Sequence, residues 1–264
     1  MDLELTGETI VVTGATSGIG AAVTRRLAEE GAHVLLVARD EQRLRAAVAG
    51  LPGGPHAFAA VDVGDLDAGE RIVAAALAEL GRLDAVVMAA GASRRARPEE
   101  LTEADWEQQW RLNVLAPQRL LLAASDALVS APRGGRAVLV SSSSGKRPSP
   151  GNMAYGVTKS AQLALSRAWA DHLAPRGVRV NAVAPGPIDG EMWLQPGGLA
   201  DQAAAAAGVT REQALESARA RVPLRRFGTP DEIADAIVLL ASHRAGFTAG
   251  AAWSVDGGSV PFYL

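Results

Sequence analysis

Short runs of β-branched residues alternate along this chain with longer alanine-rich stretches, and this alternation constrains the fold more than any other feature. The short runs are apolar throughout. Strands without a polar face must be covered on both sides, as they are in a parallel sheet flanked by helices. We therefore predict an α/β fold, a doubly wound parallel sheet of about seven strands forming one domain over residues 1–264. The predicted strands are 9–13, 33–38, 56–61, 84–88, 136–140, 178–183 and 251–255, and the first helices are 18–30, 41–49 and 65–80.

One segment, near residues 187–227, breaks the alternation. It contains proline–glycine pairs, an alanine run and a helix-like stretch over 210–221. The segment is longer than an ordinary connection, and ligands in open α/β sheets bind beyond the carboxyl ends of the strands. We interpret it as a lid over such a site, with a surface helix of no further role as the alternative.

Composition narrows the class of protein. The chain has 264 residues, a net charge of -3 and no cysteine. This charge favours neither nucleic acid nor an anionic membrane as partner, and a cysteine-free chain has no disulfide or thiolate site. The four histidines show no metal-ligand spacing, so no metal site is predicted. The acidic amino-terminal residues and the absence of a long apolar stretch lead us to expect a soluble cytoplasmic protein.

Two local motifs carry chemistry. A glycine-rich turn, Gly14-x-x-x-Gly18-x-Gly20, follows the first predicted strand and opens the first helix, which suits a pyrophosphate. Tyr155 and Lys159 are four residues apart on one helix face, although the chain has only two tyrosines and two lysines. A nearby ammonium favours the phenolate form of tyrosine, whose pKa would otherwise be about 10, so we predict a lowered phenol pKa.

Together these motifs resemble the short-chain dehydrogenase/reductase family, in the branch with TGxxxGxG and YxxxK motifs, and the chain is similar to its 3-oxoacyl-[acyl-carrier-protein] reductase-like members. The resemblance implies a Rossmann fold, a nicotinamide dinucleotide, and hydride transfer between nicotinamide C4 and a small-molecule carbonyl or secondary alcohol. The positions that match cofactor contacts of the family are Gly14, Thr16, Ser17, Gly18, Ile19, Gly20, Arg39, Asp62, Val63, Ala90, Gly91, Tyr155, Lys159, Pro185, Gly186 and Ile188.

The end of the second strand discriminates between the two dinucleotides. Relatives that prefer NAD place an acidic residue there, where this chain has Ala38 followed by Arg39. An arginine pairs with the 2′-phosphate of NADP, and no carboxylate repels it. We predict NADP(H) over NAD(H), and we expect Asp40 to cap the next helix.

The resemblance also implies catalytic roles. Tyr155 corresponds to the general acid/base, and Lys159 to the residue that binds the nicotinamide ribose and lowers the tyrosine pKa together with the oxidised ring. Ser142, thirteen residues before Tyr155, corresponds to the serine that hydrogen-bonds the substrate oxygen. Asn113 matches the asparagine that completes the tetrad through a water. Two asparagines usual before Ala90 are replaced by Met88 and Ala89, which removes a bracing hydrogen bond worth about 1 kcal/mol.

The substrate is left open by the sequence. Position relative to the motifs predicts a substrate wall of Ser93, Arg94, Ser144, Pro150, Met153 and Trp193. The basic residues around Arg94 and Arg97 suit an anionic substrate or an acyl carrier protein, while a solvated basic loop is an equal alternative. A homotetramer is implied by the family, with the apolar tail 260–264 at an interface. A dinucleotide sensor without chemistry, and a dehydratase or epimerase on the same scaffold, are the alternative functions.

Overall fold

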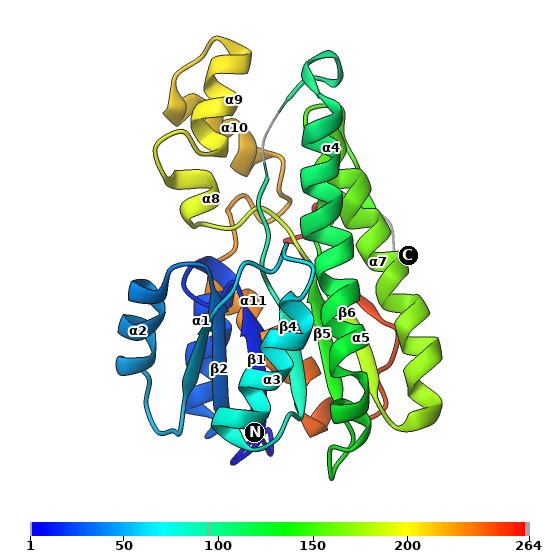
Figure 1. Ribbon diagram of the computed structural model, residues 1–264. Coiled ribbons are helices and arrows are strands. Elements are labelled where there is room, and N and C mark those ends of the chain that lie inside the picture. The colour runs from blue at the N-terminus through cyan, green and yellow to red at the C-terminus, as the bar shows by residue number, and fades with distance from the viewer. Residues whose placement is uncertain (1, 94–95, 262–264) are drawn as a thin grey trace.

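Residues 2–93 and 96–261 are described by the computed structural model, and within them seven strands form one parallel sheet (Figure 1). The strand order is β3-β2-β1-β4-β5-β6-β7, so the predicted doubly wound α/β fold is confirmed. Every strand lies within two residues of its predicted bounds. The strands are β1 (Thr9–Thr13), β2 (His33–Ala38), β3 (Ala57–Ala60), β4 (Ala85–Met88), β5 (Arg136–Val140), β6 (Arg179–Pro185) and β7 (Ala252–Val255).

Helices cover both faces of the sheet and divide the core into two layers. Val23 and Ile237 pack on one face, and Ile72 and Leu121 pack on the other. The first layer contains α1 (Gly18–Glu29), α2 (Glu41–Ala49) and α11 (Pro230–Ala241); the second contains α3 (Ala68–Leu80), α5 (Ala116–Val129) and α7 (Met153–Leu173). Helix α3 begins three residues later than predicted, because residues 65–67 form a turn before it. Most strand residues are apolar on both sides of the sheet because both sides are buried.

Local sequence signals explain where several helices begin. The Thr229 hydroxyl accepts a hydrogen bond from the backbone N–H of Glu232, and the Glu232 carboxylate accepts one from the backbone N–H of Thr229, which forms a capping box before Pro230. Asp40 accepts from the backbone N–H of Arg43, as predicted for a cap of α2. These bonds satisfy amide groups that the first helical turn leaves without partners.

The chain crosses the sheet between β3 and β4, which places β1 between β2 and β4. A crevice opens above the carboxyl ends of the strands at such a reversal of order. The insertion 187–227 lies above these ends and forms three helices, drawn in yellow to orange in Figure 1. They are α8 (Glu191–Leu194), α9 (Leu199–Ala207) and α10 (Arg211–Ala220). A small core of Ala200, Leu215 and Phe227 holds them together.

The helix that borders the crevice is irregular. Helix α4 (Glu103–Trp110) continues into α5 through a π-helical stretch, Arg111–Leu115. Such stretches shift the helix register by one residue and occur often at functional sites. Shorter elements complete the fold: α6 (Ser143–Lys146) and the 3-10 turns Pro98–Glu100, Ala174–Arg176 and His243–Ala245.

A buried charged cluster lies at the opposite end of the sheet from the crevice. The Glu8 carboxylate accepts hydrogen bonds from the guanidinium of Arg136 and, at 2.6 Å, from the His243 ring. Arg136 is 1% exposed and also donates to the carbonyl of Ala241 at 2.9 Å. The cluster joins β5 to the end of α11, so it stabilises the base of the sheet rather than the crevice.

Candidate active site

Ser142, Tyr155 and Lys159 meet at the carboxyl end of β5. Ser142 follows this strand and caps α6, while Tyr155 and Lys159 lie in the first two turns of α7. The Ser142 hydroxyl hydrogen-bonds the Tyr155 phenol, and it also accepts from the backbone N–H of Ser144 at 3.0 Å. The Lys159 Nζ lies 5.7 Å from the centre of the tyrosine ring. The structure thus places a hydroxyl, a phenol and an ammonium around one point of the cleft.

The ionisation of this group differs from the predicted one. Burial raises the pKa of the Tyr155 phenol, and the hydrogen bond with Ser142 only partly opposes it. The lowered pKa expected from the lysine is therefore not found in the protein by itself. Burial also lowers the pKa of Lys159 to about 7, so its positive charge is weaker than the spacing along the helix suggested. The phenol holds its proton at neutral pH.

Asn113 lies at the centre of the π-helical stretch and is fully buried. Its Nδ2 donates to Oε1 of Gln109 at 2.8 Å and to Oγ1 of Thr158 at 3.0 Å, which joins α4 to α7 next to Lys159. The Asn113 Oδ1 has no protein partner among the described residues. Neither Gln109 nor Thr158 was predicted as a site residue.

Gln162 is a further residue that the sequence predictions missed. It lies one turn after Lys159 on α7, and its Oε1 accepts a hydrogen bond from Lys159 Nζ at 3.0 Å. The i+3 spacing from Lys159 and the i+7 spacing from Tyr155 put it on the same face of the helix. A glutamine on this face was the available signal.

The glycine-rich turn is shaped by close backbone approach. Gly14 has a φ of +68°, and a Cβ there would lie 2.9 Å from the backbone of Ala90. A Cβ on Gly20 would lie 2.1 Å from the carbonyl oxygen of Gly14. Ser17 is the N-cap of α1 and makes no side-chain cap hydrogen bond, while Ile19 packs against the core. The amide groups at the start of α1 are therefore available to a phosphate.

Two arginines lie at the end of the crevice near β2. Arg39 is exposed and forms no ion pair with a described residue. Arg43, which the sequence analysis did not single out, donates to the carbonyl oxygen of Thr16 at 3.0 Å and pairs with Glu191 of α8 at 3.3 Å. It therefore joins the glycine-rich turn to the inserted helices.

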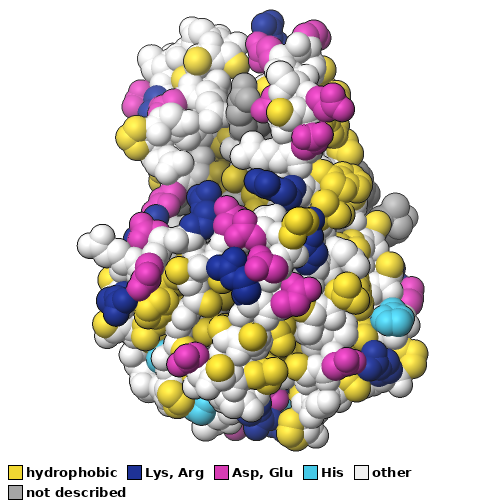
Figure 2. Space-filling model, in the orientation of Figure 1, with side chains coloured by type: hydrophobic (Ala, Val, Ile, Leu, Met, Phe, Trp, Pro, Cys, Tyr) yellow, Lys and Arg dark blue, Asp and Glu magenta, His cyan; other side chains and the backbone are white. Residues whose placement is uncertain are grey.

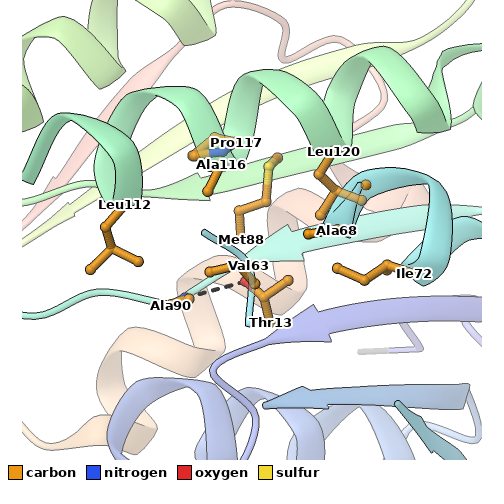
Figure 3. Close-up of a pocket in the computed structure, with 11 residues that line it drawn as sticks. Thr13, Val63, Ala68, Ile72, Met88, Ala90, Leu112, Ala116, Pro117 and Leu120 are labelled. Atoms are coloured by element: carbon orange, nitrogen blue, oxygen red, sulfur yellow. Dashed lines mark hydrogen bonds between the residues drawn. The ribbon is translucent and has the colours of Figure 1, made fainter. Parts of the chain in front are cut away.

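An apolar pocket is lined in part by Val63, one of the predicted cofactor contacts (Figure 3). The Met88 side chain extends into this pocket toward α5, so the position that usually carries a bracing amide contributes packing instead. The Thr13 hydroxyl accepts from the backbone N–H of Ala90 at 3.3 Å and holds the end of β4 to β1. The pocket is lined by Thr13, Val63, Ala68, Gly69, Ile72, Met88, Ala90, Leu112, Ala116, Pro117 and Leu120.

The segment after β6 crosses the crevice on the other side of the tyrosine. Pro185 ends β6, and a Cβ on Gly186 would lie 2.8 Å from the Cα of Asp256. Ile188 pairs with Gly228 and so fixes both ends of the insertion. A Cβ on Gly91 would lie 3.8 Å from Lys159 Nζ, at an ordinary contact distance, so this glycine lies directly beside the ammonium.

The residues predicted to form the substrate wall lie in different surroundings. Ser93 Oγ accepts from Asn152 Nδ2 at 3.1 Å, which places it against the start of α7 beside Met153. Ser144 is half-buried in α6, whereas Pro150 is exposed. Trp193 packs on Phe227 with ring centres 4.8 Å apart, so its ring belongs to the core of the insertion. Arg94 lies outside the described residues.

Charges on the surface are mixed. On the face seen in Figure 2, basic and acidic side chains intermingle across the middle of the molecule. Arg97, predicted to add positive charge at the cleft, is paired with Glu100 at 2.8 Å. Among the described residues no group of three histidine, aspartate or glutamate side chains could hold a metal ion. In the same part of the chain, every helix is too short or too polar to cross a membrane.

Comparison with known proteins identifies the family. A family model described as Enoyl-(Acyl carrier protein) reductase matches residues 14–260. The 3-oxoacyl-[acyl-carrier-protein] reductase of Thermotoga maritima is 33% identical over 98% of this chain and 100% of its own length. The chain belongs to the short-chain dehydrogenase/reductase family. The prediction of an oxidoreductase of this family is thereby confirmed.

Other members differ in the substrates that their names state. Galactitol 2-dehydrogenase of Agrobacterium fabrum is 30% identical over 97% of this chain and 99% of its own. Among solved structures, the L-sorbose reductase of Gluconobacter frateurii, complexed with NADPH and L-sorbose, superimposes with a TM-score of 0.90 at 30% identity, over 100% of both chains. Levodione reductase also superimposes with a TM-score of 0.90, at 26% identity over 98% of this chain and 100% of its own. The family is thus compatible with several carbonyl classes.

Proposed function

We propose that this protein is an NADP(H)-dependent oxidoreductase that interconverts a small-molecule carbonyl and the corresponding secondary alcohol. The observation that supports this most is the contact of the Ser142 hydroxyl with the Tyr155 phenol, next to a buried Lys159. A protonated phenol beside a second hydroxyl is suited to hold a carbonyl oxygen and to give it a proton. The L-sorbose reductase complex with NADPH supports the choice of cofactor.

The crevice fits a dinucleotide phosphate. Gly14 and Gly20 leave no room for side chains, and the start of α1 offers amide groups to a pyrophosphate. Arg39 is exposed and has no ion-pair partner among the described residues, so its guanidinium is available to a 2′-phosphate. Arg43, anchored on Thr16, adds a second guanidinium at the same end. Asp62, Val63, Ala90 and Gly91 would hold the adenosine and ribose, and Pro185, Gly186 and Ile188 the nicotinamide end.

When bound, the cofactor supplies the hydride. The residues of the chain then have to orient the substrate and move one proton. In the reductive direction Ser142 donates a hydrogen bond to the carbonyl oxygen, and Tyr155 transfers its phenolic proton to that oxygen as negative charge develops. The raised pKa of Tyr155 in the protein keeps this proton in place before the reaction. Lys159 stabilises the phenolate that the transfer leaves, and Asn113 fixes α7 through Thr158.

The substrate class is proposed only as a small carbonyl or alcohol. The pairing of Arg97 with Glu100 reduces the positive charge at the cleft mouth, which argues for a neutral substrate over an acyl carrier protein. The neutral compounds named among the relatives and similar structures are galactitol, L-sorbose and levodione. The cytoplasmic location expected from the sequence stays a prediction.

The test is NADPH oxidation across a panel of ketoses, cyclic ketones and β-ketoacyl thioesters, with Tyr155→Phe as the matched variant. We expect turnover to fall by about 10²–10⁴-fold in Tyr155→Phe, the range typical of a lost general acid, while NADPH binding by fluorescence titration stays unchanged. Retained turnover in this variant would exclude the assigned role of Tyr155. An absence of turnover on every class, despite tight NADPH binding, would favour a dinucleotide sensor.

We also propose that the chain assembles as a homotetramer. Trp110, Leu122 and Val157 expose apolar side chains on α4, α5 and α7, which pack side by side. Such a grouping is typical of an interface. Multi-angle light scattering should give about four times the 27.2 kDa chain mass, and Leu122→Glu should reduce it. A monomeric mass for the unmodified protein would contradict the proposal. Residues 262–264 of the predicted interface tail lie outside the described residues.

A further inference from the structure

The Lys159 side chain is held by two neutral oxygen atoms. Its Nζ donates to the carbonyl oxygen of Val140 at 2.8 Å and to Oε1 of Gln162 at 3.0 Å. Lys159 is 2% exposed and Gln162 is 1% exposed, so neither atom has water as a ready substitute. An ammonium has three N–H donors and no acceptor, which requires that the oxygen of the Gln162 amide, not its nitrogen, faces the lysine. These contacts use two of the three donors, and the third has no partner within residues 2–93 and 96–261, so it is available to a ligand.

Ionised carboxylates do not account for the charge on Lys159. The ionisable group that lies near the Lys159 ammonium is the Tyr155 phenol on the same helix. The neighbouring elements present uncharged groups at this level: the Val140 carbonyl of β5, the backbone of Gly145 in α6, and the Asn113 side chain of the π-helical stretch by way of Thr158. Burial away from water lowers the pKa of Lys159 to about 7. A group that titrates at neutral pH is sensitive to the loss of a single acceptor.

We propose that Gln162 is a positioning residue for the reaction, which keeps the Lys159 side chain protonated and directs its remaining N–H donor into the cofactor cleft. The expected effect on catalysis rests on the proposed function, whereas the expected effect on the protonation of Lys159 does not. A hydrogen bond to the charged form favours that form, and among the described residues the Gln162 amide and the Val140 carbonyl provide it. In this proposal Gln162 acts through Lys159, whose Nζ it contacts.

The chain allows the proposal to be tested directly, because it has only two lysines, Lys146 and Lys159. Protein labelled with ¹³C at lysine Cε gives two side-chain signals, which the substitution Lys146→Arg assigns. The pH titration of the Lys159 signal is then compared in the unmodified protein, Gln162→Met and Gln162→Glu. Methionine keeps the length of the side chain without an acceptor, and glutamate replaces the amide by a carboxylate.

We expect Lys159 to titrate near pH 7 in the unmodified protein, about one pH unit lower in Gln162→Met, and higher in Gln162→Glu. Gln118→Met is the matched control, because it removes an amide that accepts from the Trp169 indole at 2.7 Å and not from Lys159. Its Lys159 signal should titrate as in the unmodified protein. Identical titration in all four proteins would overturn the proposal. If Gln162→Met fails to fold, Gln162→Glu alone tests it, since an unchanged titration there has the same meaning.

The activity arm separates this inference from the proposed function. The alkaline limb of the pH profile of kcat/KM should move to lower pH in Gln162→Met and to higher pH in Gln162→Glu, in step with the measured titration. Turnover that survives in Tyr155→Phe would remove the proposed function but leave the lysine titration valid. An active enzyme that depends on Tyr155, with an alkaline limb that no Gln162 variant moves, would overturn the inference alone.

Discussion

A methyl group added to Gly14 should destabilise the protein by about 2–5 kcal/mol. The φ of Gly14 is +68°, a conformation that costs a residue with a Cβ about 1–2 kcal/mol. The new Cβ would also lie 2.9 Å from both Cα and N of Ala90, atoms of the backbone that cannot rotate away. Relieving such overpacking by a backbone shift adds about 1–3 kcal/mol.

Gly18 provides the matched control within the same turn. Its φ is +48°, yet a Cβ built on it meets nothing within 4 Å. Gly18→Ala should therefore lower the free energy of unfolding only through its unfavourable positive φ. It should retain about 1–3 kcal/mol more stability than Gly14→Ala. Because a difference of 1 kcal/mol moves the Tm of a chain of this size by about 2–4 °C, the two variants should melt roughly 2–12 °C apart.

Calorimetry on both variants without cofactor measures this difference, and NADPH titration adds a second comparison. The Cβ of Gly18→Ala projects into space that the protein leaves open, where the proposed pyrophosphate would lie. We expect Gly18→Ala to weaken NADPH binding while it stays the more stable variant. Equal Tm values, or a lower Tm for Gly18→Ala, would refute the reasoning from close approach.

Two further predictions concern charge. Arg39→Ala should raise the KM for NADPH by about tenfold and leave the KM for NADH nearly unchanged, because it removes one charge-assisted contact with a 2′-phosphate. Arg45→Ala, on the exposed face of α2, serves as the control. An unchanged preference for NADPH in Arg39→Ala would contradict the assignment. Burial lowers the pKa of His243, so the folded protein binds this proton less readily than the unfolded chain, whose histidine titrates near 6.5. The folded protein therefore has its full stability with respect to this group above about pH 6.5 and loses stability as the pH falls from there toward the lowered pKa. Between pH 7.5 and 5, the free energy of unfolding of His243→Gln should depend less steeply on pH than that of the unmodified protein. Parallel curves for the two proteins would count against this prediction.

The sheet was predictable because its strands are buried on both faces. In a run such as Thr9–Thr13, the three central residues are apolar on both sides of the strand, and all five are β-branched, which suits a buried strand. The start of α2 was predictable for a related reason, since Asp40 accepts a hydrogen bond from a backbone N–H only three residues later. Both signals are local. Neither depends on what the rest of the chain does.

Features that depend on tertiary contacts were not predictable in this way. The π-helical stretch Arg111–Leu115 has no signature in its own residues. Trp193 was predicted in the substrate wall from its position relative to the motifs, and the contact of its ring with Phe227, 34 residues later in the chain, had no signal in the sequence. The direction of the Tyr155 pKa was wrong for the protein alone because spacing along a helix indicates how near a charge is and not how deeply both groups are buried.

The glutamines on α4 and α7 suggest how sequence analysis could have found more of the site. On α7, Tyr155, Lys159 and Gln162 recur at the spacing of a face that the helix buries, where an uncharged polar side chain costs free energy unless it finds a partner. Ser166 on the same face is an exception, because its Oγ has no hydrogen-bond partner among the described residues. Gln109 occupies the corresponding buried face of α4, four residues before Asn113. A polar residue on an otherwise buried helix face implies a polar neighbour, and in both helices that neighbour is a residue of the predicted catalytic tetrad. The helical periodicity of buried positions therefore identifies more than the apolar core. In α4 and α7, glutamines at such buried positions mark residues that support the catalytic group.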